Sequence, residues 1–314
     1  MNSFIEKHKA AVGAALTFFG GMCWGLSGTC GQFLFTQKNV TSLWLVPIRL
    51  LVAGVVLLAV QFAKGPAAAL APWKESRDRR ELLIYGLLGI TLCQLTYFGT
   101  IQLSSAGVAT IMQSLSPLPI LLCGCAAARR KPTALQLGSI ALALLGVFLI
   151  VTHGSLTQMA VSPAAICTGL ISALAVTVYN VVPGRLLRRH PTSLLQGWSF
   201  LMGGILLALL FRPWQYHVEI DLGFVLAFCA VVLLGNVLAF NLYMYGVRLI
   251  GPEKGILYGF SEPVAAAVLS SLWLGTPFTG WEAAGFGCIF LTLALLSRPK
   301  AAAGQRHTAA AKAV

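Results

Sequence analysis

The sequence predicts an all-α, polytopic membrane protein with ten transmembrane helices arranged as two inverted five-helix repeats. Composition, the lengths of the apolar runs and an internal repeat lead to this prediction. Of the 314 residues, 57% are apolar and only 10% are charged, whereas about 25% are charged in soluble globular proteins. With a mean hydropathy of +0.82, the apolar surface must face lipid rather than water.

The apolar runs have the lengths that membrane crossing requires. A hydrocarbon core about 30 Å thick takes roughly 20 helical residues, so the chain has room for about ten crossings and none for a soluble catalytic domain. The first five spans are expected near residues 11 to 35, 43 to 63, 82 to 103, 106 to 128 and 134 to 151. The second five are expected near residues 162 to 183, 193 to 211, 222 to 246, 254 to 274 and 280 to 297.

Charge predicts the orientation of these spans. If the N-terminus is cytoplasmic, Lys38 and Arg212 are the basic residues of the outer segments, Arg49 lies inside a span, and every other Lys and Arg falls in an inner segment. Cytoplasmic loops of membrane proteins carry such an excess of basic residues. We therefore expect a multi-pass protein of the cell membrane with both termini cytoplasmic, and the net charge of +13 does not indicate nucleic-acid binding.

Cysteine usage predicts neither a disulfide framework nor a metal site. All eight cysteines lie in apolar stretches, where they are typical packing residues. Cys123 and Cys125 are two residues apart, but no His or second cysteine pair stands near them. No cofactor is expected.

An internal repeat divides the chain into two halves. The segment from Tyr97 to Pro117 aligns without a gap on the segment from Tyr243 to Pro263. We expect one five-helix repeat over residues 1–152, a second over 153–300, and a cytoplasmic tail over 301–314. Because five is odd, the second repeat enters the membrane from the opposite side, and such inverted repeats support alternating access. The alternative is a duplication that only built a large bundle.

Several short motifs, in order along the chain, resemble the EamA-type branch of the drug/metabolite transporter superfamily. They are the Trp24 and Gly25 pair, Arg49, the segment from Ser105 to Ala109 leading to Ser116 and Pro117, the segment from Ser261 to Val264, and Leu274 with Gly275. The resemblance implies ten helices and the transport, often outward, of small organic metabolites such as amino acids or of drug-like compounds. In that family Glu often follows Leu-Gly, whereas this chain has Thr276, so no role of that Glu is carried over.

Glu262 is the first candidate for a functional residue. It lies about 12 Å into its predicted span, close to the middle of the membrane, where an unpaired carboxylate is costly and usually faces a cavity or a partner. Pro263 also denies the preceding turn a helical hydrogen bond. The functional interpretation is contact with a substrate amine or a proton-titrated switch. The structural one is a hydrogen-bonded or protonated Glu at a kink.

Arg49 has three open interpretations. It lies about 9 Å below the outer edge of its span, from where its side chain has the length to snorkel to the interface. Anion binding is the second interpretation, and pairing with Glu262 is the third.

Neutral polar residues near the centres of other spans complete the expected binding pocket. Side-chain amides and aromatic rings spread over several helices can converge on a pocket, although each one also serves to join helices. With Glu262, the substrate-binding candidates are Trp24, Gln94, Gln113, Asn180 and Tyr258. Pro117 and Pro119 in the fourth span mirror Pro263 in the ninth, and matched helix breaks point to the binding site of inverted-repeat transporters.

Two rival classes of protein remain. An intramembrane enzyme would need His, Cys or paired acids in register within the spans, and every His lies in a loop or tail. A passive channel would need a filter or a ring of charge, and nothing resembles one. The sequence therefore favours a carrier for a small solute, the family resemblance implies an exporter, and the oligomeric state is left open.

Overall fold

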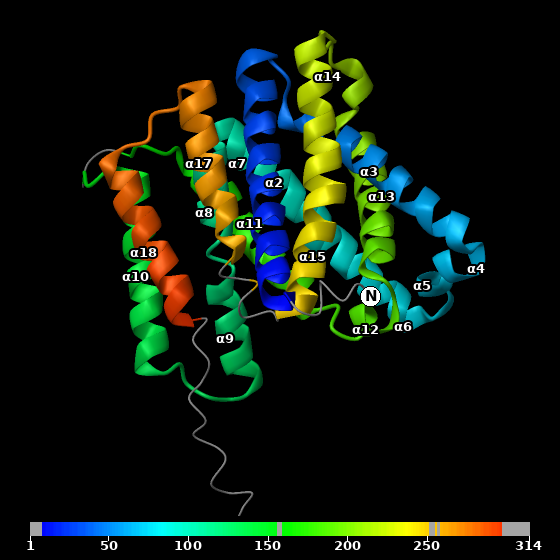
Figure 1. The fold of residues 1–314 in the computed structure, drawn as a ribbon, viewed down its shortest axis with the longest axis horizontal. Coiled ribbons are helices and arrows are strands. Elements are labelled where there is room, and N and C mark those ends of the chain that lie inside the picture. The colour runs from blue at the N-terminus through cyan, green and yellow to red at the C-terminus, as the bar shows by residue number, and fades with distance from the viewer. Residues whose placement is uncertain (1–7, 156–158, 251–254, 256–257, 297–314) are drawn as a thin grey trace, which may run out of the picture.

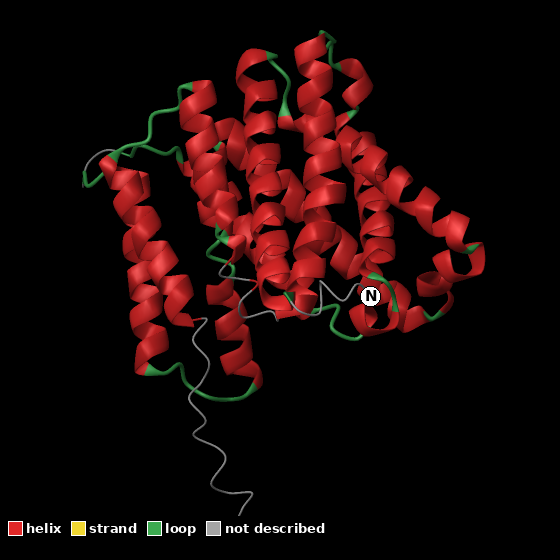
Figure 2. Cartoon of the chain, in the orientation of Figure 1, coloured by secondary structure: helices red, strands yellow, loops and turns green. Residues whose placement is uncertain are grey.

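The computed structural model describes residues 8–155, 159–250, 255 and 258–296, which form helices and loops with no strand among them (Figure 1, Figure 2). In this described part, eight helical segments are long and apolar enough to cross a membrane, and two shorter apolar helices follow them. The predicted all-α polytopic fold is confirmed. The tail predicted over 301–314, the predicted start of the ninth span at residue 254 and the last residue of the tenth lie outside the described residues.

The first half of the chain carries five spans. It begins with α2 (Lys9–Gln37), α3 (Ser42–Lys64) and the short helices α4 (Pro66–Ala69) and α5 (Ala71–Lys74). One continuous helical segment follows, made of α6 (Ser76–Leu83), the π-helix η1 (Ile84–Thr91) and α7 (Leu92–Leu103). The half ends with α8 (Ala106–Gln113), α9 (Pro117–Ala127) and α10 (Ala134–Thr152). The fourth span was expected near residues 106 to 128, with a kink at its prolines. It is broken at residues 114–116, because Pro117 begins a new helix and has no N–H to donate.

The second half repeats this order. It begins with α11 (Pro163–Val181), the short helix α12 (Leu186–Arg189), α13 (Thr192–Phe211) and the single turn η2 (Pro213–Gln215). One continuous helical segment follows, made of α14 (Leu222–Cys229), the π-helix η3 (Ala230–Leu238) and α15 (Ala239–Ile250). The half ends with α17 (Ser261–Leu274) and α18 (Gly280–Leu296). The helices begin where the sequence supplies caps. Side-chain oxygens accept from backbone N–H groups three residues on at Thr41, Ser105, Thr133, Ser162 and Asp221.

Irregular helix geometry recurs at matching places in the two halves. The register that lays Tyr97 on Tyr243 also lays Ile84, where the π-helix η1 begins, on Ala230, where the π-helix η3 begins. It lays Pro117, where α9 follows the helix break, on Pro263 in the first turn of α17. The matched breaks expected from the prolines are therefore present.

The two halves run in opposite directions and pack as symmetric partners. We call the end of the bundle that carries α12 the α12 end, and the end where α14 begins the α14 end. In Figure 1, α2 runs from the α12 end to the α14 end, while α11 runs the opposite way. Helix α2 packs on α15, as α11 packs on α7, and α3 packs on α13 and α10 on α18. Each contact thus has its counterpart in the other half.

Close packing at the centre depends on glycine. A Cβ atom at Gly20 of α2 would lie 2.8 Å from the backbone nitrogen of Tyr243, and one at Gly25 would lie 2.6 Å from the carbonyl oxygen of Glu262. These distances are shorter than carbon contacts allow, so α2 approaches α15 and α17 only because both positions lack side chains. This close approach places Glu262 beside α2.

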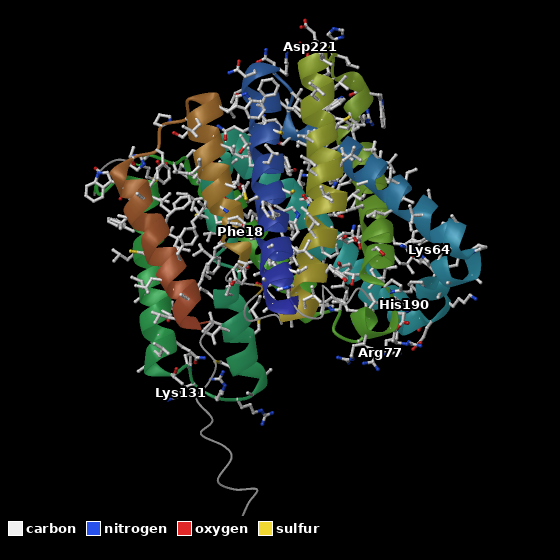
Figure 3. The ribbon with its side chains drawn as sticks, viewed as in Figure 1. Phe18, Lys64, Arg77, Lys131, His190 and Asp221 are labelled. Carbon is white, nitrogen blue, oxygen red and sulfur yellow. The ribbon has the colours of Figure 1, made fainter. Side chains whose placement is uncertain are left out.

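Charged residues separate between the ends. Figure 3 shows Arg77, Lys131 and His190 at the α12 end and Asp221 at the α14 end. At that second end Lys38 forms an ion pair with Asp221. The described connections at the α12 end thus contain most of the basic residues that the sequence assigned to the inner side.

Candidate functional site

A cavity of about 500 Å³ lies where the two halves meet. Its lining comes from spans of both halves, including both π-helical segments. It extends toward the α12 end, because Leu187 of α12 and Thr192 at the start of α13 belong to its wall. None of its described lining residues comes from the connections at the α14 end. The cavity is therefore approached from one end of the bundle.

Five of the six predicted binding residues line this cavity. They are Trp24, Gln94, Gln113, Asn180 and Glu262. Tyr258 is 39% exposed and is not part of the wall, whereas its neighbours Gly259 and Phe260 are. One residue turns the side chain about 100° around a helix, so Tyr258 faces away from the cavity although it lies at the right depth in the sequence.

The predicted residues differ in how far their polar atoms are already engaged. Gln113 donates from Nε2 to Ser172 Oγ over 2.9 Å and to Cys93 Sγ over 3.1 Å. Asn180 donates from Nδ2 to the Val176 carbonyl one turn earlier, over 2.8 Å. These amides join or complete helices, which is the structural alternative expected for them.

Trp24 makes a structural hydrogen bond and also presents its half-buried ring to the cavity. Its indole Nε1 donates to the carbonyl of Gly235 in η3 over 2.9 Å, and its ring centroid lies 5.0 Å from that of Tyr243. Both rings line the cavity. Other aromatic side chains of the wall are Tyr85, Tyr97, Phe98, Tyr179, Phe200, Phe240 and Phe260, so the cavity offers several aromatic rings to a ligand.

The carboxyl of Glu262 is half-buried in the cavity wall. Among the described residues, no side chain forms an ion pair with it, since the ion pairs involve Asp221, Glu81, Glu282, Glu75 and Asp78. Glu262 also receives no hydrogen bond from a described side chain, so the hydrogen-bonded form of the structural interpretation is not seen and its protonated form stays open. Its position leaves the carboxyl facing the space where a ligand would lie.

Arg49 does not snorkel, and it does not pair with Glu262. Its side chain is only 2% exposed and lies in the cavity wall. Its Nη1 donates to Gln94 Oε1 over 3.2 Å and its Nη2 to Asn236 Oδ1 over 2.5 Å, while its Cζ stacks 4.1 Å from the ring centroid of Phe98. The two neutral amides and the ring hold the guanidinium inside the bundle, so it neither snorkels nor pairs with Glu262. Anion binding by Arg49 stays a prediction.

Tyr97 and Tyr243 belong to the wall but were not among the sequence candidates. A signal for them was present, because the repeat alignment superimposes them. In a two-fold arrangement, equivalent residues face the axis together, and the cavity lies between the halves. The repeat register was thus informative about the site as well as about the fold.

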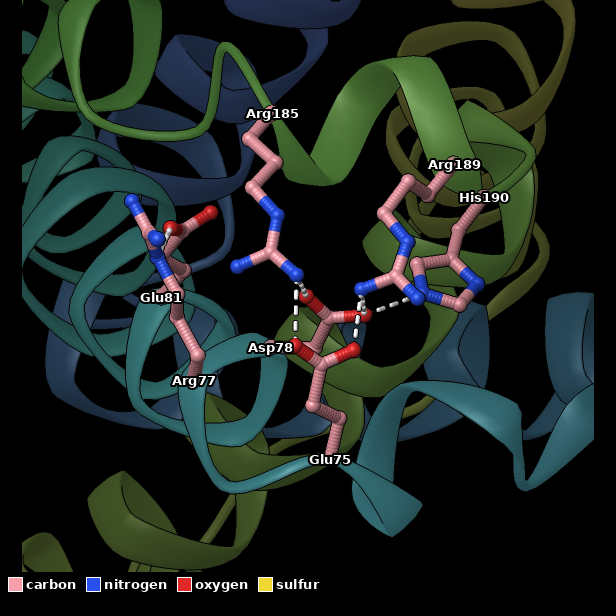
Figure 4. A network of polar contacts seen from close by, with 7 residues as sticks. All are labelled: Glu75, Arg77, Asp78, Glu81, Arg185, Arg189 and His190. Carbon is pink, nitrogen blue, oxygen red and sulfur yellow. Dashed lines mark hydrogen bonds and ion pairs between the residues drawn. The ribbon is translucent and has the colours of Figure 1, made fainter.

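A charged cluster joins α12 of the second half to the start of α6 in the first half (Figure 4). Arg185 and Arg189 of the second half both bind Glu75 of the first half, the Arg185 contact being 2.5 Å long. Arg189 and His190 also bind Asp78, over 2.8 and 2.9 Å. The hydrogen bonds from Arg185 and Arg189 lower the pKa of Glu75 to about 2, so it stays ionised throughout the physiological range.

Comparison with known proteins gives consistent matches along the chain. The sequence profile of the EamA-like transporter family matches residues 11–152 and 163–298. The uncharacterized inner membrane transporter YicL of Salmonella typhimurium is 38% identical over 256 residues, covering 82% of this chain and 85% of that protein.

More distant relatives and a solved structure match nearly the same extent. The uncharacterized transporter YetK of Bacillus subtilis is 27% identical, over 81% of this chain and 79% of that protein. The uncharacterized inner membrane transporter YedA of Escherichia coli strain K12 is 26% identical, over 82% of each. A crystal structure covers 92% of this chain and 96% of its own with a TM-score of 0.59 at 18% identity, which is a likeness of fold.

Proposed function

Because the chain belongs to the EamA-like transporter family, we propose that it is a secondary transporter that moves small organic metabolites by alternating access at the central cavity. Family membership confirms the resemblance drawn from the sequence motifs, and it makes the protein a multi-pass membrane transporter rather than an enzyme. The proposed cargo is an amino acid or a drug-like compound, and the proposed direction is export from the cell.

The cavity is the observation that carries this proposal. Ligand pockets for small organic molecules span about 300 to 1,000 Å³ and combine apolar walls with a few polar groups, and this one has about 500 Å³ with aromatic walls. Its lining contains two charged residues, Arg49 and Glu262, which do not pair with each other. A solute with an apolar body and a charged group fits such a site.

The mechanism follows from the inverted arrangement. The division at residues 1–152 and 153–300 is supported by the two segments that match the family profile. When two inverted repeats hold different conformations, exchanging those conformations moves the opening of the shared cavity from one side to the other. In this mechanism the halves rock around the cavity, and the solute crosses without a continuous pore.

Orientation is proposed from charge. The basic connections at the α12 end are typical of the cytoplasmic side, so the cavity opens to the cytoplasm and both termini are cytoplasmic. A cytoplasmic opening is the loading state of an exporter.

In this proposal Glu262 binds the solute. Its unpaired carboxyl attracts a cationic group, and a solute that binds there replaces the missing partner of a carboxylate in a low-dielectric site. Protonation of the same carboxyl would release the cation. Glu262 would then also act as the proton-titrated switch that the sequence suggested.

Counterflow in proteoliposomes tests the function. Vesicles loaded with a mixture of unlabelled amino acids should take up labelled amino acids against their concentration gradient, with saturation. Flux that rises linearly with concentration and shows no counterflow would favour the passive channel and contradict a carrier.

Glu262→Gln removes the carboxyl charge and keeps the shape of the side chain. We expect counterflow of a cationic or zwitterionic solute to fall at least about tenfold and its pH dependence to flatten. Glu219→Gln in the exposed α13–α14 connection is the matched control and should transport normally. Unchanged counterflow and pH dependence in Glu262→Gln would remove this residue from the mechanism.

A further inference from the structure

Three donor atoms near Arg49 lack partners. They are Arg49 Nε, Asn236 Nδ2 and the hydroxyl of Tyr97, each buried without a hydrogen bond. The exposed fractions of these side chains are 2%, 3% and 8%, and all three line the central cavity. Buried donors in folded proteins nearly always find an acceptor, so three of them at one cavity wall indicate a ligand that supplies acceptors.

The charge of this wall also lacks compensation. Arg49 is bound to two neutral amides, those of Gln94 and Asn236, and to the ring of Phe98. None of the described carboxylates forms an ion pair with it. A buried cation without a counterion is unfavourable, and a bound anion would remove this penalty.

The surrounding structure holds these donors in place. Asn236 lies in the π-helical segment η3, next to Gly235, whose carbonyl accepts from Trp24. A Cβ atom at Gly235 would lie 2.2 Å from Ser27 Oγ, so glycine is needed for this close packing of η3 on α2. Asn236 accepts from Arg49 within this π-helical segment, and such segments often occur at functional sites.

We propose that Arg49, Asn236 and Tyr97 form an anion-binding subsite that takes the carboxylate of a solute with an aromatic or aliphatic body. This inference rests on the proposed carrier function and deepens it. A guanidinium matches the planar geometry of a carboxylate, and the aromatic wall beside it matches an apolar body. A dianionic phosphate would need a second cation, and Arg49 is the one base among the described lining residues.

Binding of a matched pair of probes tests the subsite. The purified full-length protein is titrated with 3-phenylpropanoate and with its neutral isostere 3-phenylpropanamide, and binding is followed by thermal shift and by tryptophan fluorescence. We expect the carboxylate to bind at least about tenfold more tightly than the amide. Equal affinity for the two probes, or no binding of the carboxylate, would overturn the subsite.

Three variants assign the binding to the named residues. Arg49→Gln should remove the preference for the carboxylate. Asn236→Asp keeps the acceptor that Arg49 already uses but adds a fixed counterion, so it should fold and also lose the preference. Tyr97→Phe removes only an unpartnered hydroxyl and should weaken carboxylate binding severalfold while the apo protein unfolds at an unchanged temperature. Retained preference in Asn236→Asp would contradict the proposal even if Arg49→Gln fails to fold.

Counterflow separates this inference from the proposed function. Carboxylate binding that depends on Arg49, without counterflow of any amino acid, would uphold the subsite and refute the carrier. Counterflow that is equal in the wild type and in Asn236→Asp would uphold the carrier and refute the subsite.

Discussion

Equivalent helices close one end of this bundle and leave the other end open. At the α14 end, α17 lies against α2 and buries Ser261, Pro263, Ala265, Ala266, Ala267 and Ser270. At the α12 end, its counterpart α9 buries only Leu118 and Cys125. The cavity opens at the end where α9 stands away from the bundle. Symmetric sequence positions thus hold two different packing states at once.

Polar contacts explain why the α14 end is closed. Gln32 of α2, 4% exposed, donates from Nε2 to Thr276 Oγ1 over 2.7 Å and accepts at Oε1 from the Ala106 N–H over 2.8 Å and from Ser270 Oγ over 3.0 Å. This one amide joins α2, α8 and the end of α17 across the two halves. The difference between the ends indicates that breaking such contacts at one end must accompany closure at the other.

Gln32→Leu should have the largest effect on this asymmetry. It leaves the buried N–H of Ala106 and the hydroxyl of Ser270 without a partner, which costs about 2 kcal/mol of folding free energy. We expect a lower unfolding temperature in detergent and a shift toward the state that is open at the α14 end. Thermal unfolding and counterflow measure the two effects.

Gln102→Leu is the matched control for this variant. Gln102 accepts from the Ser42 N–H over 2.7 Å, a contact within the first half. Loss of this hydrogen bond should therefore leave unchanged the balance between the state open at the α12 end and the state open at the α14 end. A Gln32→Leu protein that unfolds and transports as the wild type does would show that this amide does not hold the end closed.

The fold was largely predictable from the sequence because its causes are local. Lipid requires long apolar helices, and the spans could be placed from run lengths, caps and charges; the span expected at residues 43 to 63 is the helix Ser42–Lys64. The break before Pro117 was underestimated, because a proline alone does not reveal whether a helix bends or ends. The π-helical segments left no clear signal in the sequence; η3 packs on α2 and η1 on α11, which are contacts between distant parts of the chain.

The site was predictable only in part. Three amides, one tryptophan and a midplane acid near the span centres identified five wall residues, but the rotation of Tyr258 away from the cavity depends on helix phase near a break. Arg49 stayed ambiguous because its length permits either snorkelling or burial, and only the position of Asn236 and Phe98 decides between them. That position is set by tertiary contacts between the two halves.

Glu75→Gln, at the α12 end, should lower the stability of the protein less than Gln32→Leu does at the α14 end. The pKa of Glu75 is lowered from its ordinary value of 4.5 to about 2 by hydrogen bonds from Arg185 and Arg189. A lowered acid pKa contributes stability that is present above pH 4.5 and is lost as the pH falls toward 2. The variant should therefore be slightly less stable than the wild type at pH 7, with the difference closing over that acidic range.

Salt and a control variant sharpen this prediction. Because Glu75 is partly exposed, its ion pairs are screened, so the difference at pH 7 should shrink at high salt. Glu219→Gln at the α14 end should show no such pattern. A stability difference that persists at pH 2 would mean that the Glu75 charge is not its cause.

Alternating access is tested most directly by measuring one distance at each end of the bundle in the same preparation. In a variant without native cysteines, spin labels at residues 131 and 188 report on the α12 end, and labels at residues 37 and 277 report on the α14 end. In the Gln32→Leu background we predict that the 131 to 188 distance shortens while the 37 to 277 distance lengthens. Two distances that stay fixed, or that lengthen together, would contradict the exchange of conformations between the inverted halves.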